Sequence, residues 1–166
     1  MSARVVVLIS GNGSNLQAIL DACAAGVLSA SVVAVFSNKT NAYGLQRARD
    51  AGVVAEALPF GPYRRGHATP RIAYDAALAE RVAAHAPDLV VLAGFMRILS
   101  PRFIDAFRGR LINLHPALPG AFPGTHAIER ALDAFRAGGP SVTGVMVHHV
   151  IPEVDAGAPI AVVEVE

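Results

Sequence analysis

The chain has 166 residues, of which 53% are hydrophobic and 16% are charged, so it can bury a substantial core, and its length predicts a single domain over residues 1–166. The formal charge of +1 gives no strong field of either sign, so composition offers no reason to expect nucleic acid or an acidic membrane surface as a partner. One cysteine rules out an internal disulfide, and no apolar run is long enough to span a bilayer, so we expect a cytoplasmic protein.

The first half of the chain alternates between β-branched apolar runs and segments with helical periodicity. This alternation predicts βαβ units and a parallel sheet. The expected strands are residues 5–10, 31–37 and 53–58, and the expected helices are residues 16–23, 43–51 and 72–84. Residues 59–70 have no periodic pattern and are expected to form a mobile loop.

The second half begins with the most apolar strand of the chain, residues 88–93, which is expected in the middle of the sheet. Ser100 and Pro101 have the pattern of an N-cap followed by a proline, which predicts a short helix to residue 107. The remaining expected elements are strands at 111–115, 142–150 and 159–166 and a helix at 125–137. We predict an α/β fold with a single doubly wound, mostly parallel sheet and helices on both faces, as in Rossmann-like proteins.

A glycine-rich turn, SGNGSN at 10–15, joins the first strand to the first helix. Glycines allow a ligand to approach closely, and the helix N-terminus presents free N–H groups to an anion, so the turn can bind phosphate. It lacks the lysine of a Walker loop, and Leu16 replaces the last glycine of the dinucleotide motif, which disfavours nucleoside triphosphates and NAD. The turn can equally form without a ligand, with Ser14 as the helix cap.

Asn113 and His115 lie two positions apart at the end of an apolar run that stops at Pro116. On a strand they share one face, where the amide can donate to an oxyanion and the imidazole can transfer a proton near neutral pH. Taken alone, this triplet is more often a strand end with two exposed polar residues.

Six segments spread over nearly the whole chain carry motifs of one enzyme family. They are VLISGNGSNLQAIL (7–20), FSNK (36–39), DLVVLAGFMRILS (88–100), INLHPALP (112–119), PG (123–124) and EVDAG (153–157). These segments closely resemble the phosphoribosylglycinamide formyltransferases, which are folate-dependent enzymes of purine biosynthesis. The GNGSN turn and the AGFMRIL segment are characteristic of that family, whereas Asn-x-His-Pro with a later aspartate is shared by folate formyltransferases in general.

The resemblance implies transfer of the formyl group of 10-formyltetrahydrofolate, as co-substrate, to the amine of glycinamide ribonucleotide. The reaction would proceed by direct attack through a tetrahedral intermediate, without a metal or a covalent enzyme intermediate. The resemblance also implies a catalytic triad of Asn113, His115 and Asp155. The implied phosphate-binding residues are Gly13, Ser14 and Asn15, and the implied folate-binding residues are Arg71, Met96, Arg97, Ile98, Leu99, Asn113, Ile151, Pro152, Glu153, Val154 and Asp155.

The chemistry of such a triad is coherent. Attack by an amine on the formyl carbon produces an oxyanion and an ammonium, and the leaving folate nitrogen must gain a proton. We expect Asn113 and a protonated His115 to stabilise the oxyanion, and Asp155 to stabilise charge on His115 and to order a water that carries the proton. Without the resemblance, Asp155 is more often only a turn residue. His148 can face this site or pack within its strand, and His126 can touch substrate or cap a helix.

The chain departs from the family in two places. Residues 116–119 are PALP where many members have PSLLP, and the C-terminal segment of longer members has no counterpart after Glu166. The alternatives are a formyltetrahydrofolate hydrolase with the same fold and triad, or a non-catalytic folate- or nucleotide-binding module. A transferase acting on initiator tRNA would need a nucleic-acid domain and a more basic surface. We therefore expect small-molecule substrates as partners, no nucleic acid and no membrane, and a monomer or homodimer.

Overall fold

The computed structural model describes residues 2–65 and 67–165. The chain divides into two compact units, unit 1 at residues 1–111 and unit 2 at residues 112–166. Each unit has its own secondary structure. The single domain expected from the length stays a prediction.

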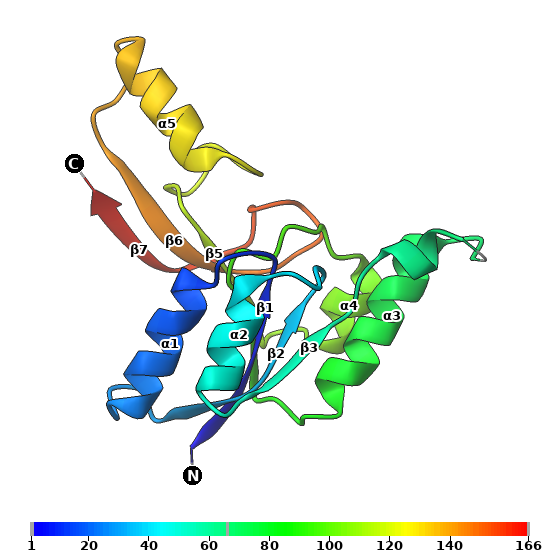
Figure 1. Ribbon diagram of the computed structural model, residues 1–166. Coiled ribbons are helices and arrows are strands. Elements are labelled where there is room, and N and C mark those ends of the chain that lie inside the picture. The colour runs from blue at the N-terminus through cyan, green and yellow to red at the C-terminus, as the bar shows by residue number, and fades with distance from the viewer. Residues whose placement is uncertain (1, 66, 166) are drawn as a thin grey trace. The chain divides into compact units, whose positions relative to one another are not determined.

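Unit 1 is built on four parallel strands in the order β3-β2-β1-β4 (Figure 1). They are β1 (Ala3–Ile9), β2 (Ala30–Ser37), β3 (Val54–Ala57) and β4 (Leu89–Leu92). β1 lies between β2 and β4, and its residues from Val5 to Ile9 are all buried. A strand inside a parallel sheet is covered on both faces, so a continuous run of β-branched and aliphatic residues suits this position.

Helices connect these strands. They are α1 (Ser14–Ala24), α2 (Tyr43–Asp50), α3 (Pro70–Ala83) and α4 (Pro101–Ala106), with a short 3-10 helix η1 (Gly61–Arg64) before α3. From β1 the chain runs through α1, β2 and α2 to β3, and α3 then returns it to β4 on the other side of β1. Because parallel crossovers are right-handed, this reversal places α3 on the face of the sheet opposite α1 and α2 (Figure 1).

The winding of unit 1 reverses between β1 and β4, and doubly wound sheets bind ligands beyond the carboxyl ends of their strands at such a point. The turn that follows β1 starts at Ser10, and the loop that follows β4 occupies residues 93–100. The Met96 N–H donates a hydrogen bond to Ser10 Oγ at 2.7 Å. The fold of unit 1 thus brings the glycine turn next to the loop after β4.

Unit 2 contains antiparallel strands and a helix. The elements are β5 (Leu111–His115, whose first residue belongs to unit 1), α5 (Ala127–Arg136), β6 (Thr143–His149) and β7 (Pro159–Val165). β6 pairs with β5 and with β7. The register of β5 and β6 sets Asn113 opposite His148, and neighbouring side chains on one face of such a pair are in contact.

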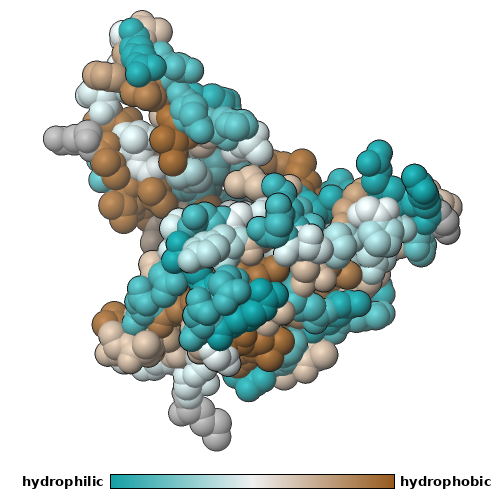
Figure 2. Space-filling view, in the orientation of Figure 1, coloured by the Kyte–Doolittle hydropathy of each residue, from teal (hydrophilic) through white to brown (hydrophobic). Residues whose placement is uncertain are grey.

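Apolar side chains are exposed on α5 and β7. Ile128, Leu132 and Phe135 are spaced by four and three positions, so they share one face of α5, and all three are exposed. Every residue of β7 is also exposed. Figure 2 shows hydrophobic residues gathered over this part of unit 2. Unit 2 therefore exposes apolar side chains on both α5 and β7.

The predicted α/β class with parallel βαβ units is confirmed, and the differences lie at helix starts. Gly13, not Ser14, is the N-cap of α1, and it adopts the left-handed conformation. The helix expected from residue 125 begins at Ala127, with His126 as its N-cap. The segment 59–70, expected to be a mobile loop, contains η1 and the first residue of α3.

Two residues of the expected elements, Gly66 and Glu166, lie outside the described part of the chain. Within that part, no helix is long and apolar enough to cross a membrane.

Candidate active site

The end of β5 places Asn113 and His115 on one face of the strand, as the alternation of side chains predicts. His115 is 3% exposed and Asn113 is half-buried, so these are not the exposed strand-end residues that such a triplet usually provides. Pro116, which cannot continue the ladder, follows at once. At the end of β5, His115 is therefore buried and Asn113 half-buried.

Asp155 reaches both side chains from the turn between β6 and β7. Its Oδ1 accepts a hydrogen bond from Asn113 Nδ2 at 3.1 Å, and its Oδ2 lies 3.4 Å from His115 Nδ1. Oδ2 also accepts a hydrogen bond from the Gly124 N–H at 2.8 Å. The Asp155 side chain is 10% exposed. The predicted triad therefore comes together within unit 2.

The backbone at Asp155 has a φ of 53°, in the left-handed region that aspartate tolerates better than most residues. Two residues later, a Cβ on Gly157 would lie 1.6 Å from the His149 carbonyl oxygen. Only glycine fits there, because the turn passes directly over the end of β6. The tight turn thus fixes where the carboxylate of Asp155 points.

His148 is a fourth member of this cluster. Its Nδ1 donates to the backbone carbonyl of His149 at 2.9 Å, so in the neutral ring Nε2 is the acceptor. Nε2 lies 3.1 Å from Asn113 Nδ2 and 3.4 Å from Asp155 Oδ1. The two hydrogens of the Asn113 amide are therefore matched to two acceptors, Asp155 and His148.

Both ring nitrogens of His115 face oxygen atoms. Nε2 lies 3.1 Å from the Phe122 carbonyl oxygen, and Nδ1 faces Asp155. A carbonyl oxygen and a carboxylate are both acceptors, so a doubly protonated ring can donate at both positions. The cluster therefore suits a histidine that carries and passes on a proton.

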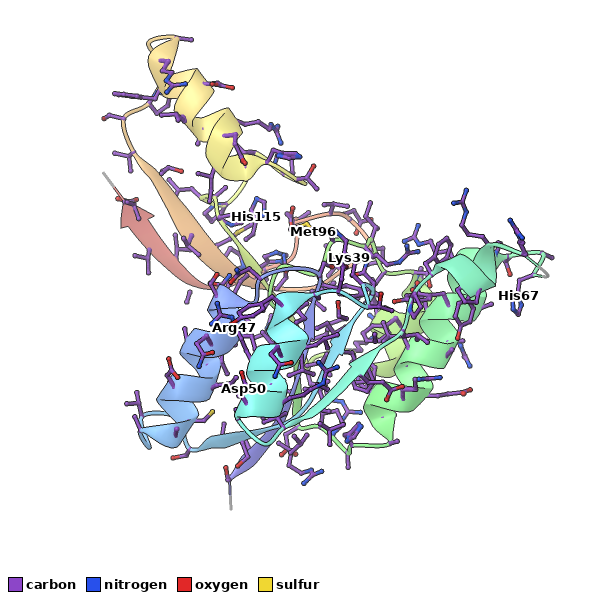
Figure 3. The ribbon with its side chains drawn as sticks, in the orientation of Figure 1. Lys39, Arg47, Asp50, His67, Met96 and His115 are labelled. Carbon is purple, nitrogen blue, oxygen red and sulfur yellow. The ribbon has the colours of Figure 1, made fainter. Side chains whose placement is uncertain are left out.

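In unit 1, the turn after β1 packs tightly against the start of α2. A Cβ on Gly13 would lie 2.7 Å from the Gly44 Cα, and the Gly44 N–H donates to the Gly11 carbonyl at 3.0 Å. Arg47 extends from α2 to this turn (Figure 3), where Nε donates to the Asn12 carbonyl at 2.9 Å and Nη2 to the Asn12 Oδ1 at 2.8 Å. The turn is thus held against α2 at the start of α1, where unpaired helix N–H groups can meet an anion.

The loop after β4 contains four predicted folate-binding residues. Met96 and Ile98 are 60% and 58% exposed, whereas Leu99 is buried. The Arg97 guanidinium lies 3.8 Å from the ring centre of Phe60, a cation–π contact. The loop therefore exposes two large apolar side chains at alternate positions.

A match to a protein-family model identifies the family. The model described as Formyl transferase matches residues 3–166. The chain belongs to the formyl transferase family.

Several relatives of this formyl transferase have the same name or a synonym of it. Phosphoribosylglycinamide formyltransferase of Schizosaccharomyces pombe is 52% identical over 172 residues, which cover 99% of this chain and 83% of the relative. The Escherichia coli protein of the same name is 48% identical over 154 residues, covering 93% of this chain and 68% of the relative. The structure of glycinamide ribonucleotide transformylase 1 from Symbiobacterium toebii matches with a TM-score of 0.88 at 45% identity, covering 99% of this chain and 73% of that chain. The predicted formyltransferase fold is confirmed.

The remaining predicted site residues of this formyl transferase fall into two groups. Arg71, on α3, donates from Nη2 to the Leu99 carbonyl at 2.8 Å, so it joins the loop after β4. The four residues that precede Asp155 in its turn are exposed: Ile151, Pro152, Glu153 and Val154.

His126 is exposed at the N-cap of α5, where its Nδ1 lies 3.7 Å from Glu129. In the described ranges, no group of three or more His, Cys, Asp or Glu is placed to hold a metal ion.

Proposed function

We propose that this chain transfers the formyl group of 10-formyltetrahydrofolate to the amine of glycinamide ribonucleotide, a step of purine biosynthesis. The observation that carries the proposal is the buried cluster in unit 2, in which Asp155 binds Asn113 and faces His115. The match to this chain covers 83% and 68% of the lengths of two relatives whose names state this activity. A cytoplasmic location fits the single cysteine, and a monomer or homodimer is our expectation for its assembly.

In the proposed reaction, the substrate amine attacks the formyl carbon, and the carbonyl oxygen becomes an oxyanion in a tetrahedral intermediate. Asn113 Nδ2 is the proposed donor to this oxyanion. One of its hydrogens must then leave its present acceptor. We propose that the bond to His148 is the one exchanged, because a hydrogen bond to a neutral ring is weaker than one to the carboxylate of Asp155. Asp155 would thus keep the amide oriented while it turns to the substrate.

The proton balance assigns roles to His115 and Asp155. The attacking nitrogen loses a proton, the folate nitrogen gains one, and the bond between that nitrogen and the formyl carbon breaks. Because Nδ1 of His115 is held by Asp155, Nε2 is the atom proposed to turn from the Phe122 carbonyl toward the substrate. Asp155 has a second task in this proposal, which is to order the water that carries the proton.

Two further binding surfaces are proposed within unit 1. We propose that the phosphate of the ribonucleotide binds at Gly13, Ser14 and Asn15, where helix N–H groups and the glycine backbone allow close approach. The exposed side chains of Met96 and Ile98 offer an apolar surface for the flat rings of the folate, with Arg71 and Arg97 beside them.

The test mixes 10-formyltetrahydrofolate with glycinamide ribonucleotide and follows the release of free folate. Release that requires the ribonucleotide supports the proposal. Release of folate and formate at the same rate without the ribonucleotide would instead identify a hydrolase, and binding without release would identify a binding module.

A further inference from the structure

Side chains from the turn after β1 and from α3 hold the loop between β4 and α4. The Met96 N–H donates to Ser10 Oγ at 2.7 Å, and the Leu99 carbonyl accepts from Arg71 Nη2 at 2.8 Å. The Ser100 N–H donates to Asp75 Oδ2 at 2.6 Å, a short bond to a carboxylate. α3 thus supplies two of these three anchors, both at the end of the loop that joins α4.

Asp75 is a costly residue for this position. It is 0% exposed, and its Oδ1 has no hydrogen-bond partner among the described residues. Burying a carboxylate with so few hydrogen bonds is unfavourable, and an apolar side chain of similar size is often more stabilising. Its neighbours on the buried face of α3, Leu78 and Ala79, are apolar. Apolar packing therefore does not explain an aspartate here, and the bond to the Ser100 N–H is the interaction that the carboxylate provides.

The loop itself needs anchoring. It exposes Met96 and Ile98, so these two side chains contribute little packing that would hold the backbone. Arg97 instead packs inward, with its guanidinium 3.8 Å and 4.7 Å from the ring centres of Phe60 and Tyr74. The backbone must follow one particular path to point Arg97 inward and Met96 and Ile98 outward. The hydrogen bond that the Ser100 N–H donates to Asp75 fixes the end of that path.

We propose that Asp75 is a positioning residue that holds Met96 to Leu99 in the conformation that binds folate. The inference rests on the proposed function, which makes this loop a folate-binding surface. Asp75 acts through the backbone of Ser100 and does not touch the substrate. A residue that only anchored α4 would affect stability, whereas a positioning residue affects the affinity for one of the two substrates.

The test compares three variants of the full chain. Asp75→Ala removes the acceptor and is expected to raise both the Kd and the KM for 10-formyltetrahydrofolate about tenfold, or about 1.4 kcal/mol, with the KM for the ribonucleotide unchanged. Asp75→Asn keeps one acceptor oxygen and is expected to recover most of the affinity. Tyr74→Phe is the matched control, because it removes the neighbouring hydrogen bond to the Leu58 carbonyl and leaves the bond to Ser100 in place.

The Kd is measured by titrating the chain with 10-formyltetrahydrofolate alone, and hydrogen exchange at the Ser100 amide reports whether the anchor is lost. A faster-exchanging Ser100 amide with an unchanged folate Kd overturns the inference, as does an equal rise of the KM values for both substrates. If Asp75→Ala does not fold, Asp75→Leu, which fills the buried position with an apolar side chain and also removes the acceptor for the Ser100 N–H, is judged by the same two measurements. A wild-type chain that binds folate but does not transfer the formyl group overturns the proposed function, while the shift in Kd still decides the role of Asp75.

Discussion

Replacing Asp155 with asparagine keeps the shape of the side chain and removes its charge. The two carboxylate oxygens accept from Asn113 Nδ2 at 3.1 Å and from the Gly124 N–H at 2.8 Å. One of these positions must become an NH2 donor, so in either orientation the new amide meets a donor. A hydrogen bond to a charged group contributes about 1.5–3 kcal/mol, so losing one bond and weakening the other removes about 3 kcal/mol. If this energy orients Asn113 and His115 for reaction, kcat falls about 100-fold.

The assay follows folate release with both substrates saturating, and a second series measures the KM for the ribonucleotide. That KM should change little, because its phosphate is proposed to bind in unit 1. Glu164→Gln is the control, since Glu164 is an exposed carboxylate on β7 of the same unit. A folded Asp155→Asn protein whose kcat stays within about twofold of the wild-type value would refute the reasoning.

Three further substitutions, the first with a matched control, test the glycine turn, the turn that carries Asp155, and Tyr74. Gly13→Ala should destabilise the chain by at least about 1–2 kcal/mol because the left-handed conformation is retained, and its Cβ, 2.7 Å from the Gly44 Cα, should also raise the KM for the ribonucleotide. Gly26→Ala has the same conformational penalty with no atom within 4 Å, so an equal KM effect in both variants would contradict a phosphate site at Gly13. Gly157→Ala should lower both stability and kcat, because its Cβ would meet the His149 carbonyl 1.6 Å away and displace the turn that carries Asp155; wild-type kcat in this variant would show that the turn is not critical. Burial raises the pKa of Tyr74 to about 12, so its neutral form stabilises the fold at neutral pH and this stability is lost as pH rises from about 10 to 12. Tyr74→Phe should show a shallower loss of unfolding free energy over that pH range, measured by urea denaturation, and parallel curves would contradict the assignment.

Periodicity made most of the fold predictable, because the residues of β1 from Val5 to Ile9 are buried on both faces and their sequence shows it directly. The start of α1 was not predictable in the same way. Serine is an excellent cap, but here Gly13 takes that position because the chain passes so close to Gly44 that a Cβ does not fit. That contact joins residues 31 positions apart, so no local pattern contains it.

The site shows the same division. Alternation alone put Asn113 and His115 on one face, whereas Asp155 is 42 positions from Asn113 and was joined to it only by resemblance to a family. The sequence alone does not decide whether His148 faces the site. That depends on the register of β5 and β6, which sets His148 opposite Asn113. Asp75 was missed, although a signal existed: an acidic residue among the apolar positions of a helix is unusual unless it has a partner.

Ser10 links two parts of unit 1 that are proposed to serve different substrates. Ser10 follows β1 at the start of the glycine turn, and its hydroxyl donates to Asn38 Oδ1 and accepts from the Met96 N–H in the loop after β4. A ligand that orders one of these segments lowers the entropy that the other segment has left to lose. Such coupling is reciprocal: whatever factor the ribonucleotide adds to folate affinity, folate must add to ribonucleotide affinity. Under the proposed function, this one buried hydroxyl would connect the segments that bind the two substrates.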